Sequence, residues 1–324
     1  MGDDAASAAQ QQRIAALLDE ARGGRRAAIA RLLSLVERGG PDARTVGRLA
    51  HPLGGTAYTV GITGAPGSGK STLTNALCTH ARTESDLERL AVLAIDPSSP
   101  FSGGAILGDR IRMGDQTLDE GIYIRSMATR GHLGGLALAT PSAIRVLDAV
   151  GFPVVVVETV GVGQVEVEIV ASADTCVVVL NPGWGDAIQA NKAGLMEIAD
   201  VFVVNKADRA GATETVSDVE QMLNLRPEDG WRPPVVSTVS TSAAGVGELW
   251  DAIWAHRRHL ERSGEGERRR RGRTATELRG IVAAQLAQRA ASLGSGPAFD
   301  AVREEVLARR LDPWTAADSL LGPA

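Results

Sequence analysis

Seven strand-like runs alternate with helical patterns between residues 56 and 262, and this alternation constrains the fold more than any other feature. The runs are short, apolar and rich in β-branched residues, as expected of buried strands. They are TAYTVGIT, LAVLAID, GIYIRSM, PVVVVE, TCVVVLN, ADVFVVN and PPVVST. Strands separated by helices favour a mostly parallel sheet with helices on both faces. The sequence therefore predicts an α/β fold whose functional groups gather at the carboxyl ends of the strands.

An N-terminal helical extension is expected over residues 1–55. The first ten residues, 1–10, are polar and are predicted to be disordered. Apolar residues at helical spacing then predict short helices over 12–24 and 25–40, each closed by a pair of glycines. A third helix is expected near 42–50. These helices must bury their apolar faces against the central domain or a second subunit.

A polar linker and a C-terminal helical arm are expected over residues 263–324, after the central domain of 56–262. The linker SGEGERRRRGR (263–273) carries a basic run, which indicates either a solvated hinge or a contact for an acidic partner surface. Two helical patterns follow it. Helical arms outside a core of this class are often used for dimerisation or regulation, which is an analogy rather than a derivation.

Composition narrows the classes of function. The net charge is −5 and the sequence pI is about 5.6, which argues against a nucleic-acid-binding protein. Two distant cysteines, Cys78 and Cys176, have no metal-type spacing and are predicted to fill core space. There is no signal peptide or apolar stretch of transmembrane length, so we expect a cytoplasmic protein without a membrane partner.

The octapeptide GAPGSGKS (64–71) follows the first strand-like run and opens a helical pattern, the context that gives G-x-x-x-x-G-K-[ST] its meaning. Its glycines let backbone N–H groups turn onto phosphate oxygens, and the helix N-terminus adds its positive end. Lys70 is expected to reach the β- and γ-phosphates and Ser71 to bind Mg²⁺. The motif predicts a P-loop NTPase. The expected nucleotide contacts are Gly64, Ala65, Pro66, Gly67, Ser68, Gly69, Lys70, Ser71 and Thr72.

Acidic residues end two of the buried runs. Glu158 closes PVVVVE and is predicted to hold Mg²⁺ in the role of the usual aspartate of D-x-x-G. Gly161 then becomes a hinge whose N–H contacts the γ-phosphate and is released on hydrolysis. Asp96 closes LAVLAID, and Asp109 lies at the far end of the loop that follows. Together with Ser71, these three acids form the expected magnesium set.

The run VFVVN continues into N-K-x-D, and this motif predicts the base. The Asp208 carboxylate can accept both the N1–H and the N2–H of guanine, whereas adenine offers no such edge. Asn205 is expected to tie this loop to the phosphate loop, and the Lys206 stem to cover the base. A backbone N–H within Val239–Thr241 (Val239, Ser240 and Thr241) is expected to meet guanine O6. The predicted ligands are GTP and GDP with Mg²⁺.

Together these motifs resemble the MeaB/MMAA family, also called ArgK, in the SIMIBI class of P-loop GTPases. The most specific segments are GAPGSGKST, IDPSSPFSGGAILGDRIRM, VVETVGVGQVEVE and GDAIQANKAGLMEIADVFVVNKAD. The resemblance implies a homodimeric GTPase that assists an adenosylcobalamin-dependent acyl-CoA mutase, chiefly methylmalonyl-CoA mutase, in cofactor loading and protection. Gln164 lies near the switch hinge in the sequence and could orient water, so it joins Lys70, Glu158 and Gly161 as a candidate catalytic residue. The resemblance also places Gln189 and Lys192 in a mobile loop that responds to the mutase.

Three other interpretations stay open at this point. A GTPase for nickel or another metal centre is the nearest, but the pair His256 and His259 has neither acidic nor cysteine residues beside it in the sequence. A P-loop kinase would need a second substrate pocket and a general base, and no motif marks either one. A non-enzymatic scaffold would not need an intact phosphate loop and acid set.

Overall fold

The structure is a computed structural model and describes residues 2–97, 119–129, 135–159, 173–183, 198–225 and 230–322. Its centre is a sheet of seven strands in the order β3-β2-β4-β1-β5-β6-β7, and every pairing is parallel. The seven expected strands are all present. They are β1 (Tyr58–Gly64), β2 (Leu90–Pro97), β3 (Ile122–Thr129), β4 (Val154–Thr159), β5 (Thr175–Leu180), β6 (Val201–Asn205) and β7 (Val235–Thr238).

Strand β1 lies between β4 and β5. The connection that leaves β1 leads to β2 on one side of the sheet, and the connection that leaves β5 leads to β6 on the other, so the direction of the connections reverses between β1 and β5. In the register, Ile62 pairs with Glu158 on one side and Gly64 pairs with Val179 on the other. Ligands of open parallel sheets bind beyond the carboxyl ends of the strands at such a reversal. The sequence motifs therefore meet beyond the carboxyl end of β1.

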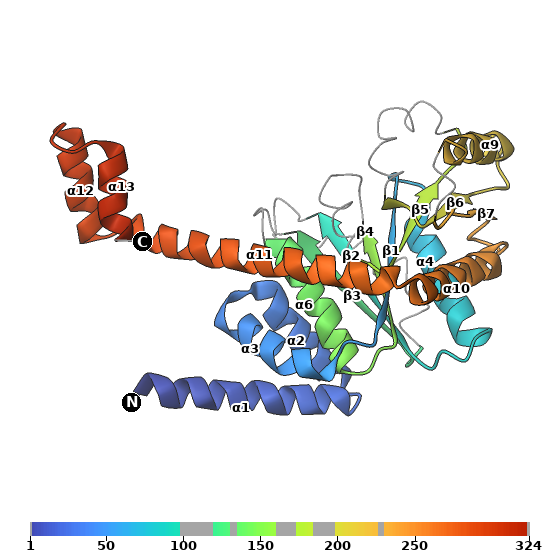
Figure 1. Cartoon of the computed structure of the whole chain (residues 1–324). Helices are drawn as coiled ribbons and strands as arrows, with labels where there is room; N and C mark the ends of the chain where they lie inside the picture. The colour runs from blue at the N-terminus through green and yellow to red at the C-terminus, as the bar shows by residue number, and fades with distance from the viewer. Residues whose placement is uncertain are drawn as a thin grey trace. The chain divides into compact units, whose positions relative to one another are not determined.

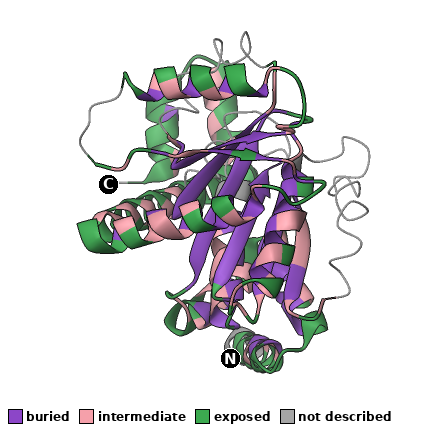
Figure 2. Ribbon diagram, turned by 90° about the vertical axis from the view of Figure 1, so that its right-hand side faces the viewer, coloured by how far each residue is buried: buried purple, intermediate pink, exposed green. Residues whose placement is uncertain are grey.

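Helices cover both faces of the sheet, and the central strands β1, β4, β5 and β6 are buried along their whole length (Figures 1 and 2). Helices α4 (Lys70–Thr83) and α10 (Val246–Ser263) pack on the face that includes Val156 and Val177. The opposite face includes Val157 and carries α6 (Gly135–Ala149). Cys176 pairs with Gly61 on this second face, and α9 (Ala212–Leu223) packs there against β5 and β6.

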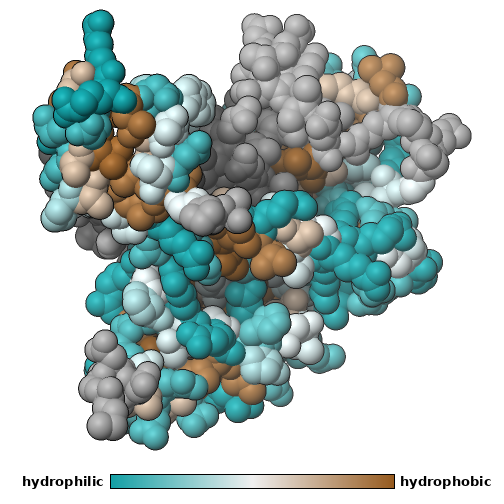
Figure 3. Space-filling view, turned by 60° about the vertical axis from the view of Figure 1, so that its left-hand side comes forward, coloured by the Kyte–Doolittle hydropathy of each residue, from teal (hydrophilic) through white to brown (hydrophobic). Residues whose placement is uncertain are grey.

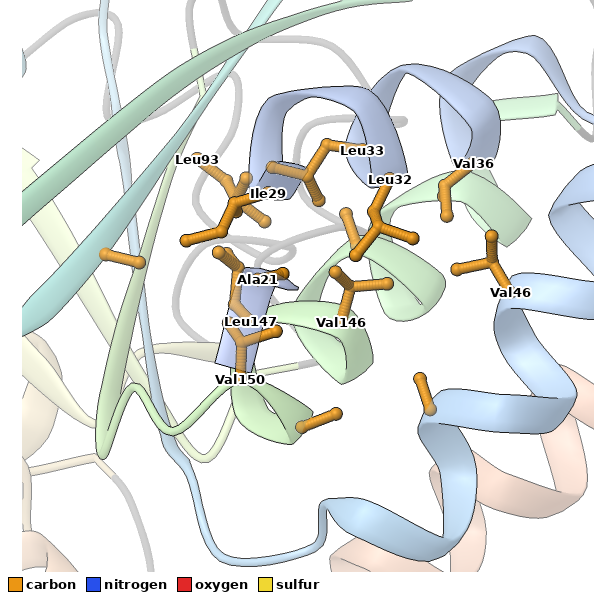
Figure 4. Close-up of a cluster of buried hydrophobic side chains, with 14 of the residues drawn as sticks. Ala21, Ile29, Leu32, Leu33, Val36, Val46, Leu93, Val146, Leu147 and Val150 are labelled. Carbon is orange, nitrogen blue, oxygen red and sulfur yellow. The ribbon is translucent and has the colours of Figure 1, made fainter. Parts of the chain in front are cut away.

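The N-terminal helices belong to the core. Helices α1 (Gly2–Arg22), α2 (Arg26–Arg38) and α3 (Gly40–Ala50) pack against α6 and the face of β2 and β4. A single-turn 3₁₀ helix, η1 (His51–Leu53), leads on to β1. Figure 4 shows Ile29 of α2 beside Leu93 of the sheet, and Val46 of α3 beside Val36 of α2 at the other end of the same cluster. Of the two partners that the sequence left open, the central domain is the one these helices contact.

The expected disorder of residues 1–10 is wrong, because α1 begins at Gly2. Four of these ten residues are alanine, which has the highest helix propensity. The Gln10 amide also donates a hydrogen bond to Asp42 of α3. Burial of Ile14 and Leu18 then holds the helix on the domain.

The expected linker at 263–273 is also wrong, because helix α11 runs from Glu265 to Leu293 without a break. Arginines of the basic run pair with aspartates of the central domain, which draws this segment into regular structure. The basic run therefore does contact acidic residues, and these residues belong to the central domain of the same chain.

Contacts divide the chain into two compact units, residues 1–273 and 274–324. The second unit holds the rest of α11, then α12 (Pro297–Leu307) and α13 (Pro313–Leu321). Asp312 caps α13 by accepting hydrogen bonds from the N–H groups of Trp314 and Thr315. Ala316 is the one residue of this unit that is buried, within the described range 274–322.

Candidate functional site

The phosphate loop joins the end of β1 to the start of α4, and its glycines are required by close contacts. Gly64 has φ +144°, and a Cβ atom there would lie 2.1 Å from the carbonyl oxygen of Val179. Gly69 has φ +90°, and a Cβ atom would lie 2.5 Å from the Asn205 amide nitrogen. Any side chain at either position would push the loop away from β5 or from Asn205. The backbone thus comes as close to its neighbours as the motif predicts.

The Lys70 ammonium lies inside this loop. Its Nζ donates hydrogen bonds to the carbonyl oxygens of Gly64, at 2.8 Å, and Ala65, at 3.0 Å, and the side chain is buried. Lys70 is also the first residue of α4, whose leading N–H groups have no partners within the helix. A fixed cation and a positive helix end therefore converge on one loop, an arrangement that favours a polyphosphate.

Ser71 and Glu158 meet at the carboxyl end of β4. The Ser71 hydroxyl lies 2.5 Å from Oε1 of Glu158, whose side chain is 0% exposed. The negative charge of Glu158 acts on its surroundings: the pKa of the Cys78 thiol is raised by burial first and by Glu158 second. Burying a carboxylate is costly unless a positive charge is near. A hydroxyl and a carboxylate side by side also supply the hard oxygen atoms that Mg²⁺ prefers, so this pair fits the ion.

The structure describes the backbone of one further member of the expected magnesium and switch sets, and none of the others. Asp96 lies in β2, where its backbone pairs with Ala128, which puts it at the same edge of the sheet as Glu158. Its side chain is outside the described part of the structure. The predictions for Asp109, Gly161, Gln164, Gln189 and Lys192 fall outside the described residues.

Asn205 joins the loop after β6 to the phosphate loop. Its side-chain amide donates to the Ser68 carbonyl oxygen at 2.8 Å, as the sequence led us to expect. The neighbouring Lys206 has φ +57° and donates to the Gly67 carbonyl oxygen at 2.6 Å. Asp208, by contrast, is exposed and makes no hydrogen bond or ion pair with the described residues. Two side chains thus hold the loops together and leave one carboxylate available to a base.

The loop after β7 has a second role that sequence reasoning missed. The Ser240 hydroxyl donates to Oδ1 of Asn205 at 2.6 Å, and its N–H lies 3.2 Å from the same atom. The Thr238 hydroxyl donates to this oxygen as well, at 3.1 Å. Asn205 is therefore braced on its acceptor side, and the only sequence signal was a run of hydroxyl residues after the last strand.

These contacts decide which backbone N–H of residues 239–241 could donate to guanine O6. The Val239 N–H already bonds to the Ala244 carbonyl oxygen at 3.0 Å, and the Ser240 N–H faces Asn205. The Thr241 N–H has no hydrogen-bond partner among the described residues, and its side chain is exposed. Thr241 is thus the member of the expected trio that can still supply a free N–H.

A metal centre of the histidine type is not supported. Acidic residues do lie beside the histidine pair: Asp200 is 3.3 Å from His256, and Glu265 is 3.6 Å from His259. Within the described ranges, however, no three His, Cys, Asp or Glu side chains are arranged to hold a metal ion. Both cysteines are buried and free, which confirms that they fill core space. None of the described helices is long and apolar enough to cross a bilayer.

Comparison with known proteins agrees with this geometry. Residues 29–294 match the family described as "Methylmalonyl Co-A mutase-associated GTPase MeaB". A relative from Pyrococcus abyssi, named for a GTPase, is 52% identical over 310 residues, which cover 94% of this chain and 95% of the relative. The GTPase ArgK of Escherichia coli is 36% identical over 267 residues, covering 80% of each chain.

A solved structure and a mammalian relative extend the comparison. The crystal structure of a LAO/AO transport system kinase matches with a TM-score of 0.70 and 27% identity, covering 95% of this chain and 96% of the other. The mouse "methylmalonic aciduria type A homolog, mitochondrial" is 34% identical over 272 residues, covering 82% of this chain and 65% of the relative. The chain belongs to the MeaB family of P-loop GTPases.

Proposed function

We propose that this GTPase is a nucleotide-driven switch that assists an adenosylcobalamin-dependent acyl-CoA mutase in loading and protecting its cofactor. Methylmalonyl-CoA mutase is the partner to test first, because the family is described by its association with that enzyme. The observation that carries the proposal is the Asn205 side chain, which joins the phosphate loop to the base-reading loop at 2.8 Å. A cytoplasmic location is part of the proposal.

Guanine specificity would come from the exposed Asp208 carboxylate. Two parallel hydrogen bonds from the N1–H and N2–H of guanine satisfy both of its oxygens. Adenine would leave that carboxylate desolvated and unpaired, which disfavours it by roughly 10⁴-fold. Thr241 would donate its N–H to guanine O6, and the Lys206 stem would cover one face of the ring.

Hydrolysis would depend on positioning and charge. Lys70 and the phosphate-loop N–H groups face the oxygens on which negative charge is spread during phosphoryl transfer. Ser71 and Glu158 would hold Mg²⁺, with Asp96 and Asp109 proposed as further ligands, and the ion would help neutralise the phosphates. No sequence motif marks a general base for this step. Turnover should therefore be slow until the partner stimulates it, with Gly161 and Gln164 proposed to take part.

The partner's effect is proposed to pass through Gln189 and Lys192. These residues follow β5, whose carboxyl end lies beside β1 and therefore beside the phosphate loop. A segment that starts at this end of β5 could respond to the nucleotide without contacting the base. Lys192→Ala should leave basal hydrolysis within a few-fold of wild type and remove most of the stimulation by the mutase. If the mutase stimulates this variant as strongly as wild type, Lys192 does not transmit the partner's effect.

A homodimer formed through the C-terminal unit completes the proposal. Hydrophobic surface is exposed on the face drawn in Figure 3. In the C-terminal unit the large exposed apolar side chains are Leu278, Val282, Leu286, Leu293, Leu307, Trp314 and Leu321. Trp314 is 85% exposed, which is unusual for tryptophan. A second copy of the same helices would bury such a surface.

The test separates the GTPase from its rivals. Wild-type protein is incubated with GTP and, separately, with ATP, and both phosphate release and phosphate transfer are measured. We expect release from GTP alone, and Lys70→Ala should lower it by about 10²-fold. Arg271→Ala is the matched control, because Arg271 is an exposed cation outside the site. Transfer of the γ-phosphate to an acceptor, or equal use of ATP, would contradict the proposal.

A further inference from the structure

Two buried aspartates stand directly before β5 and β6, at the amino edge of the sheet and opposite the nucleotide site. Asp174 and Asp200 are 3% and 5% exposed. Asp174 accepts a hydrogen bond from the Thr59 N–H of β1 at 2.9 Å. Asp200 accepts one from the Cys176 N–H of β5 at 2.8 Å. The two carboxylates thus tie together the amino ends of the three strands.

Arginines of α11 close over these carboxylates. Arg269 donates to Asp200 at 3.0 Å, while Arg273 and Arg270 both pair with Asp174. Arg273 follows Arg269 by four residues and Arg270 by three, so it lies on the helix surface next to each of them. Arg273 also donates to the Ala173 carbonyl oxygen at 2.9 Å. We call this group the arginine clasp; its members are Asp174, Asp200, Arg269, Arg270 and Arg273.

Burial makes the clasp sensitive to the loss of one partner. Burial tends to raise the pKa of Asp174, but Arg273, the Thr59 N–H and Arg270 outweigh it, and the pKa lies below its usual value. Burial raises the pKa of Asp200 above its usual value although Arg269 opposes this. Neither carboxylate can turn to water in its present place. Removing an arginine would therefore leave a buried charge that the amino end of a strand must move to accommodate.

The strands that the clasp holds are the strands that carry the nucleotide site. Strand β1 runs from Thr59, which bonds to Asp174, into Gly64 of the phosphate loop. Strand β6 begins after Asp200 and ends at Asn205, five residues later and about 16 Å away. Each strand is hydrogen-bonded along its length to its neighbours, so a shift at its amino end reaches its carboxyl end.

We propose that the arginine clasp couples the C-terminal helix to the guanine site. With the clasp closed, β1 and β6 hold the phosphate loop and the base-reading loop in the register that Asn205 spans. When the first turns of α11 leave the domain, that register loosens and guanine nucleotide affinity falls. By linkage, bound nucleotide must tighten the clasp by the same factor. This inference rests on the proposed function, because it requires that the carboxyl edge binds guanine nucleotide.

The experiment compares two arginines of one helix. Arg269→Gln removes the charge that faces Asp200. Arg271→Gln removes an exposed charge whose ion-pair partner among the described residues is Glu267, one turn away. GDP affinity of the full-length protein is measured by calorimetry, at a temperature where circular dichroism shows each variant folded. We expect the GDP dissociation constant to rise about tenfold for Arg269→Gln and to stay within twofold for Arg271→Gln.

A second measurement needs no variant. Amide hydrogen exchange of wild-type residues 265–273 is followed with and without GDP, and we expect GDP to slow it. A purely structural clasp would lower the stability of Arg269→Gln and leave GDP affinity and this exchange unchanged, which would overturn the inference. If Arg269→Gln does not fold, unchanged exchange in the wild type overturns it alone. Failure of the wild type to bind GDP is a distinct result that removes the proposed function itself.

Discussion

The two helical ends of the chain look alike in sequence and differ in what holds them. The N-terminal helices bury Ile29, Leu32 and Leu33 almost completely and share one core with the sheet. The C-terminal unit buries only Ala316 within the range that the structure describes, and α11 is attached to the domain by ion pairs. The N-terminal helices are therefore part of the domain, whereas the C-terminal unit keeps its apolar side chains exposed.

The largest expected effect comes from truncating one leucine at each end. Leu33→Ala leaves a cavity between α2 and α6 and should lower the free energy of unfolding by about 2–5 kcal/mol. Leu286→Ala, in the exposed stripe of α11, should change it by less than about 0.5 kcal/mol in dilute protein. Urea denaturation followed by tryptophan fluorescence measures both. Equal losses of unfolding free energy at the two sites would show that both ends of the chain contribute to the core alike.

The second-largest expected effect is a pH dependence of stability, which arises from the buried histidine beside the ion pairs of α11. His256 is 0% exposed, and burial first, then Arg269, lowers its pKa to about 3. The unfolded chain binds a proton on this side chain below its ordinary pKa of 6.5, while the folded chain does not. Stability therefore falls as pH drops below 6.5, by about 1 kcal/mol between pH 6.5 and 5.5.

The matched variant for this titration is His256→Gln, which has no titrating ring. Denaturation at pH 7.5, 6.5 and 5.5 should show a flatter profile for the variant than for the wild type. Leu33→Ala should keep the wild-type slope, because apolar contacts do not titrate. Parallel profiles for wild type and His256→Gln would show that the buried imidazole does not set the dependence.

The smallest expected effect is on the domain itself when the C-terminal unit is removed. A chain ending at Arg273 keeps the arginine clasp and all three N-terminal helices. Its GDP affinity should stay within twofold of the full chain, and its unfolding free energy within about 0.5 kcal/mol. Sedimentation velocity should show a monomer for this truncated chain and, if the proposed homodimer forms, a dimer for the full chain. A dimeric truncated chain would move the subunit contact into residues 1–273.

Local patterns were enough to predict the sheet and the loops at its carboxyl edge. The valines before Glu158 mark a strand because four adjacent apolar β-branched residues suit burial on both faces. GAPGSGKS and N-K-x-D each follow such a strand, so the parallel sheet brings them to one edge. The contact from Asn205 to Ser68 was therefore expected before the structure showed it.

The amino edge could not be predicted in the same way. Asp174 and Asp200 each follow an alanine and precede a buried strand, but nothing nearby in the sequence neutralises them. Their partners are Arg269 and Arg273, about 70 and 100 residues later, in a segment whose composition indicated a solvated linker. Pairing at that sequence distance is decided by the tertiary fold, and local composition carries no sign of it. The brace from Ser240 to Asn205 was missed for the same reason.

The central claim is that the exposed Asp208 carboxylate reads guanine, and one calorimetric comparison tests it most directly. GDP and xanthosine diphosphate are titrated into wild-type protein and into Asp208→Asn, which exchanges an acceptor for a donor opposite the base. Wild type should prefer GDP, and the variant should lose affinity for GDP by 10²-fold or more, about 3 kcal/mol, while gaining affinity for xanthosine diphosphate. A variant that binds GDP as tightly as wild type would contradict the account.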